Sequence, residues 1–508
     1  MFRAVTYLVA LELMLSPASF GQSQDTAGIN RIFAAYQHSN TPGCSVGVDA
    51  PGRDTFTAAY GMADLEHGVA NTPATVFEAG SVSKQFTAAA VLLLVERGSV
   101  SLDDDIRKYF PEIPAYERPI TVRELLNHTS GLRDWGEVEA IAGWPRTTRE
   151  YTHAYVLDIL SHQHALNYPP GDAWSYTNSG YNLAAMLVER LSGKTLQSFM
   201  SAEFFTPLGM TSTQWRDDFR RVVPNRAIAY DPQGSGWSQD MPFEDVYGNG
   251  GLLTTVGDLL KWNRNLASGK LHASLFKQMQ KRSSLSDGRP IGYGFGFFLD
   301  DFQGLAEVSH SGATAAYRAW LGGIPSKGVS VAILCNAGSA FTTDMANRIL
   351  RLSLGLPDPK PLPPAKEIKP GLYRSVRDGR TMQVEEADGS ARFEGSTMFV
   401  ANPVYGEDVW ERVDPLTPGS PSEFAGTYVS EDAETTLRVE LKDGGLVIRR
   451  RPNSVFALKP TYADAFSSPL GSIHFVRGAD GRPSGFDVGS PRVWKIRFTL
   501  QDKQQQAD

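Results

Sequence analysis

A serine and a lysine lie three residues apart at the start of an apolar segment. The run Gly80-Ser81-Val82-Ser83-Lys84 opens a stretch whose apolar residues recur at helical spacing. Positions three apart share one face of a helix, so Ser81 and Lys84 are predicted to be neighbours. A serine hydroxyl needs a base to act as a nucleophile, and a lysine in a dry site has a lowered pKa and can be that base. The pair therefore predicts covalent catalysis at Ser81.

A second candidate motif is Tyr176-Thr177-Asn178. A phenol relays a proton when a nearby cation lowers its pKa, and an asparagine amide can both hold the lysine and bind a substrate carbonyl. Each motif alone is weak, because the chain also contains Ser274-Leu275-Phe276-Lys277 and Tyr247-Gly248-Asn249. The pair Ser81 and Lys84 is distinguished by its position at the start of a predicted buried helix and by the motifs that follow it along the chain.

The third motif, His310-Ser311-Gly312, ends a β-like run and is followed by Ala313. A glycine on an edge strand lets a substrate backbone lie close to the strand. The N–H of Ala313 is expected to join that of Ser81, at the helix N-terminus, in an oxyanion hole. A lone histidine at such a place is more often structural than functional.

Taken in order, the three motifs resemble those of the penicillin-recognising serine hydrolases, in the branch that holds class C β-lactamases, D-Ala-D-Ala carboxypeptidases, D-aminopeptidases and family VIII esterases. The likeness extends over about residues 26–355. Further phrases that carry it are Leu125-Leu126-Asn127-His128-Thr129-Ser130-Gly131-Leu132, Pro170-Gly171, Pro207-Leu208-Gly209-Met210 and Gly250-Gly251-Leu252.

The resemblance implies that Ser81 is acylated, that Lys84 activates it and that Tyr176 carries the proton to the leaving group. It further implies that Asn178 contacts the substrate amide and that His310 and Gly312 occupy the position of Lys-Thr-Gly in many members. Histidine is mostly neutral at pH 7, so strong recognition of a β-lactam carboxylate is in doubt. The His-x-Gly form looks more like D-aminopeptidases and some esterases.

An imidazolium at His310 would bind an anionic substrate end. In that case, affinity for carboxylate substrates is predicted to fall as the pH rises through neutrality.

The elements that must position these motifs predict an α/β fold. Two β-like runs between Cys44 and Tyr60 form a hairpin around Pro51-Gly52, and a largely apolar helix extends from Ser81 to Arg97. Three further β-like runs follow between residues 306 and 335. The expected fold class is a β-lactamase/transpeptidase-like domain, an antiparallel sheet with flanking helices and a helical subdomain, followed by all-β, barrel-like C-terminal units.

The composition changes after the catalytic region. A serine hydrolase domain at 26–355 is followed by a Pro-rich linker at 356–370, a first β unit at 371–420 and a second at 421–502. The two units share a weak repeat, in which Gly371-Leu372-Tyr373-Arg374-Ser375 matches Gly426-Thr427-Tyr428-Val429-Ser430. Coincidence of common strand and turn residues is the alternative explanation.

Composition limits the possible partners and the compartment. The net charge of −7, with scattered Lys and Arg, excludes nucleic acid, and no apolar run is long enough to span a membrane. Residues 1–21 have the basic start, short apolar core and small-residue exit of a signal peptide, so export to the periplasm or the medium is expected. Cys44 and Cys335 pair if their strands are neighbours, but buried free thiols are the commoner outcome.

The sequence therefore predicts a serine hydrolase that cleaves amide or ester bonds of small acyl or D-amino-acid-like substrates, or of short peptides, through a Ser81 acyl-enzyme. No cofactor and no metal site are predicted. The sequence gives no prediction of the oligomeric state. The alternatives are a β-lactamase or D-Ala-D-Ala carboxypeptidase, and a catalytically silent protein that binds cell-wall material.

Overall fold

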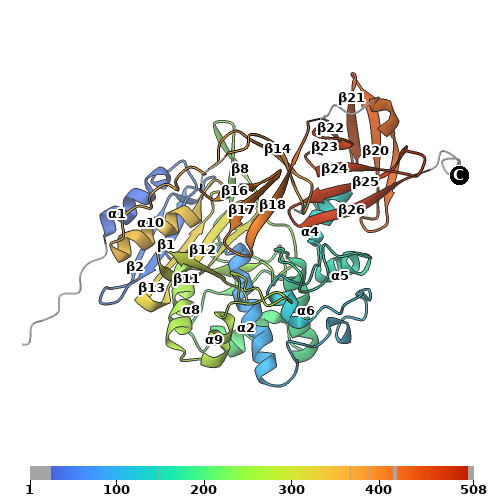
Figure 1. Cartoon of the computed structure of the whole chain (residues 1–508). Helices are drawn as coiled ribbons and strands as arrows, with labels where there is room; N and C mark the ends of the chain where they lie inside the picture. Colours follow the sequence, from blue (N-terminus) through green and yellow to red (C-terminus); the bar gives the residue numbers. More distant parts are fainter. Residues whose placement is uncertain (1–24, 147, 366–367, 388, 416–419, 502–508) are drawn as a thin grey trace, which may run out of the picture.

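The computed structural model describes residues 25–146, 148–365, 368–387, 389–415 and 420–501, and the predicted signal peptide at 1–21 lies outside them. Three parts follow one another along the chain: a sheet-and-helix domain, a small β-sheet and a β-barrel (Figure 1). Within the described residues, no helix has the length and apolar content needed to cross a bilayer.

The first part is built on a six-stranded antiparallel sheet whose strands come from both ends of the domain. The early hairpin and the late strands predicted from the sequence meet here, because β1 pairs with β2 on one side and with β13 on the other. In sheet order the strands are β10 (Phe298–Phe302), β11 (Leu305–Thr314), β12 (Tyr317–Ile324), β13 (Val329–Cys335), β1 (Cys44–Asp49) and β2 (Phe56–Tyr60).

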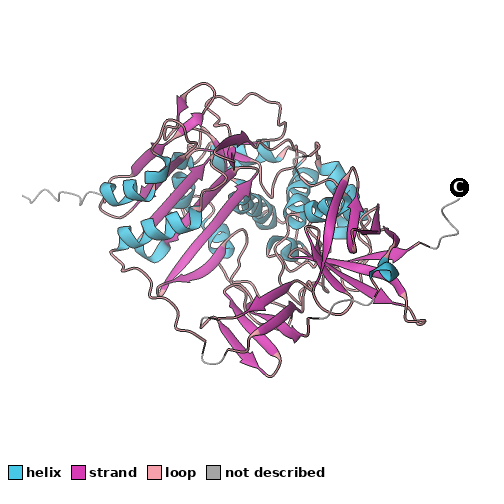
Figure 2. Cartoon of the chain, turned by 90° about the horizontal axis from the view of Figure 1, so that it is seen from above, coloured by secondary structure: helices cyan, strands magenta, loops and turns pink. Residues whose placement is uncertain are grey.

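Helices cover both faces of this sheet, as seen from above in Figure 2. Side chains alternate along β13, so that Val331 and Ile333 join the core under α1 (Thr26–Ile32) and α10 (Thr342–Leu354). Ala332 and Leu334 point the other way, into the main core that includes α8 (Val256–Ser268). Burial on both faces explains why β13 is an unbroken apolar run in the sequence.

The helical subdomain surrounds α2 (Ser83–Glu96), which is buried almost throughout. The helix begins two residues later than predicted, because Gly80–Val82 form a 3₁₀ turn, and it ends before Gly98, whose φ is +71°. The other helices are α3 (Val122–Leu126), α4 (Trp135–Ala142), α5 (His153–Ser161), α6 (Ser179–Ser192), α7 (Leu196–Met200) and α9 (Ala273–Met279).

Three short two- or three-residue strands tie this subdomain to the start of α2. The strand β5 (Phe77–Glu78) leads directly into the 3₁₀ turn, and it pairs with β9 (Leu252–Thr254), which also pairs with β6 (Gln214–Trp215). Glu78 is fully buried and accepts a hydrogen bond of 2.8 Å from Nε of Arg216. The strand that precedes Ser81 is therefore held by its pairing with β9 and by the contact between Glu78 and Arg216.

Cys44 and Cys335 form a disulfide, which corrects the expectation of free thiols. The register of β1 against β13 places these two residues directly opposite each other. The sequence could not reveal this pairing, because the two positions are 291 residues apart and become neighbours only through sheet order.

The two C-terminal units differ in closure. The first is an open five-stranded sheet in the order β15 (Thr381–Val384), β14 (Gly371–Ser375), β18 (Gly406–Val413), β17 (Thr397–Asn402), β16 (Ala391–Glu394). The second is a closed eight-stranded barrel: β19 (Gly426–Ser430), β20 (Thr435–Lys442), β21 (Gly445–Arg450), β22 (Ser454–Pro460), β23 (Ala465–Ser468), β24 (Gly471–Arg477), β25 (Pro483–Ser490) and β26 (Val493–Leu500).

The repeated segments form the first strand of each unit, β14 and β19, and one tyrosine in each makes the same hydrogen bond. The hydroxyl of Tyr373 donates to the carbonyl of Lys369 at 2.8 Å, and that of Tyr428 donates to the carbonyl of Phe424 at 2.8 Å. Both tyrosines are fully buried at the same place in their strands. This shared contact supports duplication of a β unit over coincidence.

The disulfide yields a prediction about stability. Replacing both cysteines by serine is expected to lower the free energy of unfolding by about 2–4 kcal/mol, because the bond closes a long loop in the unfolded chain. Urea unfolding with and without dithiothreitol measures this. The reductant should destabilise the natural sequence and leave the double variant unchanged; equal stability of the two oxidised proteins would contradict the prediction.

Candidate active site

Ser81 lies in the 3₁₀ turn and Lys84 in the first turn of α2, where the Lys84 Nζ is 3.2 Å from the Ser81 Oγ. The lysine side chain is fully buried. It also donates to Oδ1 of Asn178 at 2.9 Å and to the carbonyl oxygen of Asn249 at 2.8 Å. Its partners are thus two amide oxygens and one hydroxyl, all of them neutral.

This surrounding favours the neutral amine of Lys84. Burial, and secondly the charge of Arg492, hold the pKa of Lys84 well below the usual value for lysine. Two N–H bonds of a neutral amine satisfy the two amide oxygens, which leaves the lone pair for the hydroxyl hydrogen of Ser81. The geometry is that of a base beside a nucleophile.

The Tyr176 ring lies 4.7 Å from the Lys84 Nζ, measured to the ring centroid. Its hydroxyl oxygen is buried and has no hydrogen-bond partner among the described residues that meets normal geometry. Burial raises the pKa of Tyr176, and the nearby Arg492 charge and a contact with Ser81 oppose that rise without cancelling it. Tyr176 is therefore a phenol at neutral pH, with its proton available to a bound group.

The segment that contains His128 packs against Tyr176. The two rings lie 4.4 Å apart, and Nδ1 of His128 accepts a hydrogen bond of 3.3 Å from the Thr177 amide. His128 has a φ of +64°, an uncommon backbone conformation for a residue other than glycine. Burial holds the pKa of His128 well below its ordinary value, so the ring is a neutral packing surface.

Asn178 is positioned by Asp134, a residue that the sequence analysis did not select. The buried Asp134 carboxylate accepts the Asn178 amide at 2.7 Å, and it also caps α4 through the amides of Gly136 (3.1 Å) and Glu137 (3.3 Å). The available signal was an aspartate immediately before a helix start. Nothing in that signal pointed to the Tyr-x-Asn motif.

The third motif lies against the 3₁₀ turn. A Cβ on Gly312 would lie 2.1 Å from the carbonyl oxygen of Ala79, and one on Gly80 would lie 2.6 Å from the amide nitrogen of Ala313. Only glycines allow the two backbones to approach this closely, and the approach brings the amides of Ser81 and Ala313 near each other. β10 pairs with β11 only as far as Ser309, so residues 310–314 are open on that side, like an edge strand.

His310 lines the same cavity and is held in its neutral form. Burial, followed by the charge of Lys84, lowers its pKa to about 3, so the ring is neutral through the physiological range. Its Nδ1 lies 2.6 Å from the carbonyl oxygen of Ser311 and therefore carries the hydrogen, while Nε2 accepts from the Tyr293 hydroxyl at 3.1 Å. The condition for the pH-dependent binding of carboxylate substrates, an imidazolium at His310, is therefore not met near neutrality.

The competing motifs lie elsewhere. Ser274 and Lys277 are exposed on α9, and the Ser274 hydroxyl bonds to Glu96. The hydroxyl of Tyr247 bonds to Glu189 at 2.7 Å, but Asn249 from the same segment supplies the carbonyl that holds Lys84.

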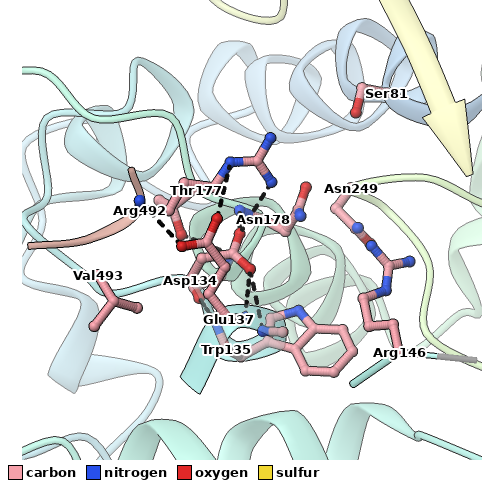
Figure 3. A network of polar contacts seen from close by, with 12 residues as sticks. Ser81, Asp134, Trp135, Glu137, Arg146, Thr177, Asn178, Asn249, Arg492 and Val493 are labelled. Atoms are coloured by element: carbon pink, nitrogen blue, oxygen red, sulfur yellow. Dashed lines mark hydrogen bonds and ion pairs between the residues drawn. The ribbon is translucent and has the colours of Figure 1, made fainter. Parts of the chain in front are cut away.

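These groups line a cavity of about 540 Å³ that contains Ser81, Tyr176, Asn178 and the strand from His310 to Thr314. Arginines from separate parts of the chain also line it: Arg146, Arg318 and Arg492. Arg318 donates to the carbonyl oxygens of Ala315 (2.6 Å) and Tyr317 (2.8 Å). Arg492 belongs to the barrel and was not selected from the sequence; Figure 3 shows it beside Asp134 and Glu137.

Comparisons with known proteins agree with this geometry. Residues 29–355 match the sequence model of the Beta-lactamase family. A D-aminopeptidase of Gluconobacter oxydans is 26% identical over 356 residues, which are 69% of this chain and 66% of that protein. A D-aminopeptidase of Brucella anthropi is 24% identical over 506 residues, 91% of each chain.

The fold likeness continues into the C-terminal units. The structure of the octameric penicillin-binding protein homologue from Pyrococcus abyssi has 21% sequence identity and a TM-score of 0.57, covering 94% of this chain and 100% of that one. The family match covers more than half of the chain and includes Ser81, Lys84, Tyr176 and Gly312. The chain is therefore a serine hydrolase that belongs to the Beta-lactamase family.

Proposed function

We propose that this enzyme hydrolyses amide or ester bonds of small D-amino-acid-like acyl groups through an acyl-enzyme on Ser81. The observation that carries the proposal is the neutral, buried Lys84 amine 3.2 Å from the Ser81 hydroxyl. The curated relatives named D-aminopeptidase support the substrate class, and one of them aligns along 91% of both chains.

In the acylation step, Ser81 Oγ attacks the substrate carbonyl carbon while its proton passes to Nζ of Lys84. The carbonyl oxygen becomes negative in the tetrahedral intermediate. The amides of Ser81 and Ala313 stabilise that charge, since Gly80 and Gly312 bring the two backbones together.

Collapse of the intermediate requires a proton on the leaving group. Tyr176 supplies it, because its raised pKa keeps the phenol protonated and its hydroxyl has no competing partner among the described residues. The Lys84 ammonium then returns its proton to the phenolate. Water cleaves the acyl-enzyme in a second step that uses the same base and the same oxyanion site.

A neutral third motif supports amide or ester substrates over β-lactams. His310 carries no charge at neutral pH, and both of its ring nitrogens are occupied by neighbours. This position therefore offers no fixed cation to a carboxylate.

We also propose that the enzyme is exported to the periplasm or the medium. The Cys44–Cys335 disulfide supports export, since such bonds persist mainly in oxidising compartments. N-terminal sequencing of the protein recovered from outside the cytoplasm should find the chain cut near residue 21. An uncut chain that remains in the cytoplasm would contradict this proposal.

The substrate class is tested with a panel. We expect hydrolysis of D-alanine p-nitroanilide to exceed that of the L-isomer at least tenfold, and a chromogenic cephalosporin to turn over slowly. Ser81→Ala should fold normally and lose about 10³-fold or more of the activity. Rapid cephalosporin turnover would instead indicate a β-lactamase, and full activity in Ser81→Ala would disprove the acyl-enzyme.

The role of Lys84 predicts a pH profile. Because only the neutral amine accepts the Ser81 proton, kcat/KM should fall as the pH drops through the lowered pKa of Lys84 and stay high near neutrality. Lys84→Gln is expected to lose about 10²- to 10⁴-fold of the activity. Lys277→Gln, on the exposed copy of the motif, is the matched control and should behave as the natural sequence.

A further inference from the structure

The barrel contributes a side chain to the active-site cavity. Arg492 lies in the turn between β25 and β26 and lines the cavity together with Ser81 and Tyr176. Its guanidinium carbon is 5.0 Å from the centroid of the Tyr176 ring. A residue more than 400 positions from Ser81 in sequence is thus beside the phenol that faces the nucleophile.

The backbone of Arg492 is pinned by hydrogen bonds across the boundary between barrel and catalytic domain. Its amide donates to Oε2 of Glu137 at 3.1 Å. Its carbonyl oxygen accepts from the Asp134 amide at 3.3 Å and from Nδ2 of Asn167 at 3.0 Å. The guanidinium lies 3.8 Å from a carboxylate oxygen of Asp134 and 3.8 Å from one of Glu137.

The segment that receives the barrel also positions the Tyr-x-Asn motif. Arg133 donates to the carbonyl of Lys495 in the barrel at 2.6 Å, while its own carbonyl accepts from the Ser179 hydroxyl at 2.6 Å. Its neighbour Asp134 pairs with Arg492 on one side and accepts the Asn178 amide on the other. A continuous set of contacts therefore extends from the barrel through Asp134 to Asn178, which holds Lys84.

We propose that Arg492 is a positioning residue for the acylation step: held by Asp134 and Glu137, it fixes Tyr176 and the Asn178 segment, so that the barrel forms part of the active site. This inference rests on the proposed acyl transfer at Ser81. It concerns the proton transfers, not the binding of a charged substrate group.

The charges around the site agree with this role. Arg492 and Arg146 lower the pKa of Lys84, and Asp134 raises it. The histidines that face the site, His128 and His310, are neutral because burial lowers their pKa values. A cation beside Tyr176 disfavours a second cation at Lys84, so Arg492 favours the amine that accepts the serine proton.

The test uses the full-length enzyme with substitutions at Arg492. In Arg492→Gln we expect kcat to fall on the order of 10- to 100-fold with little change in KM, by the same factor for cationic, neutral and anionic acyl groups. The acid limb of the kcat/KM profile should move to higher pH, because removing the cation raises the pKa of Lys84. Arg492→Lys keeps the charge and should leave that limb in place and recover part of the rate.

Two further variants sharpen the result. Asp134→Asn removes an anion that raises the pKa of Lys84, so its acid limb should move to lower pH, opposite to that of Arg492→Gln. Arg497→Gln is the matched control, since Arg497 is in the same barrel, half-exposed and paired with Asp487 at 2.6 Å. It should leave kcat, KM and the profile unchanged.

The rate at which a fluorophosphonate labels Ser81 gives a readout that does not need the natural substrate. If the natural sequence labels rapidly but hydrolyses no member of the panel, the proposed substrate class fails, and slower labelling of Arg492→Gln still supports the positioning role. If Arg492→Gln folds and the acid limb of its kcat/KM profile stays where it is in the natural sequence, the positioning role of Arg492 is disproved. A loss confined to anionic substrates would also disprove it, because it would make Arg492 a substrate-binding residue.

Discussion

The burial of one lysine among neutral acceptors is the constraint on which the site depends. A buried ammonium is costly without a partner of opposite charge, and Lys84 is surrounded by a hydroxyl and two amide oxygens. The free energy is lower when the amine is neutral, which is the form that activates Ser81. Each element around Lys84 serves this end: the apolar helix α2 excludes water, and distant loops bring the two oxygens.

The local parts of the site could be predicted from the sequence. Ser81 and Lys84 are neighbours on any helix, and Gly312 lies at the end of a recognisable β-like run, so spacing and residue type were sufficient. The antiparallel sheet, the helical subdomain and barrel-like C-terminal units were likewise expected from periodicity and from the family resemblance, although only the second of these units closes into a barrel. These features depend on short-range geometry or on motifs that keep their order along the chain.

The parts that could not be predicted depend on tertiary contacts. Asp134 had only the signal of a helix cap, and Arg492 had none, because its role arises where the barrel meets α4. The carbonyl of Asn249 is a backbone group and carries no residue signature. The neutral state of His310 at pH 7 was expected from its ordinary pKa, but the further lowering by burial and by the charge of Lys84 depends on tertiary contacts that the sequence does not show.

The order of strands in the main sheet has a consequence for biogenesis. The β1–β2 hairpin is complete early in synthesis, yet the edge of β1 is covered only when β13 has emerged, nearly 300 residues later. Until then an unpaired strand edge is exposed, which is a known risk for association with other chains. The sheet therefore closes only after nearly the whole catalytic domain has left the ribosome.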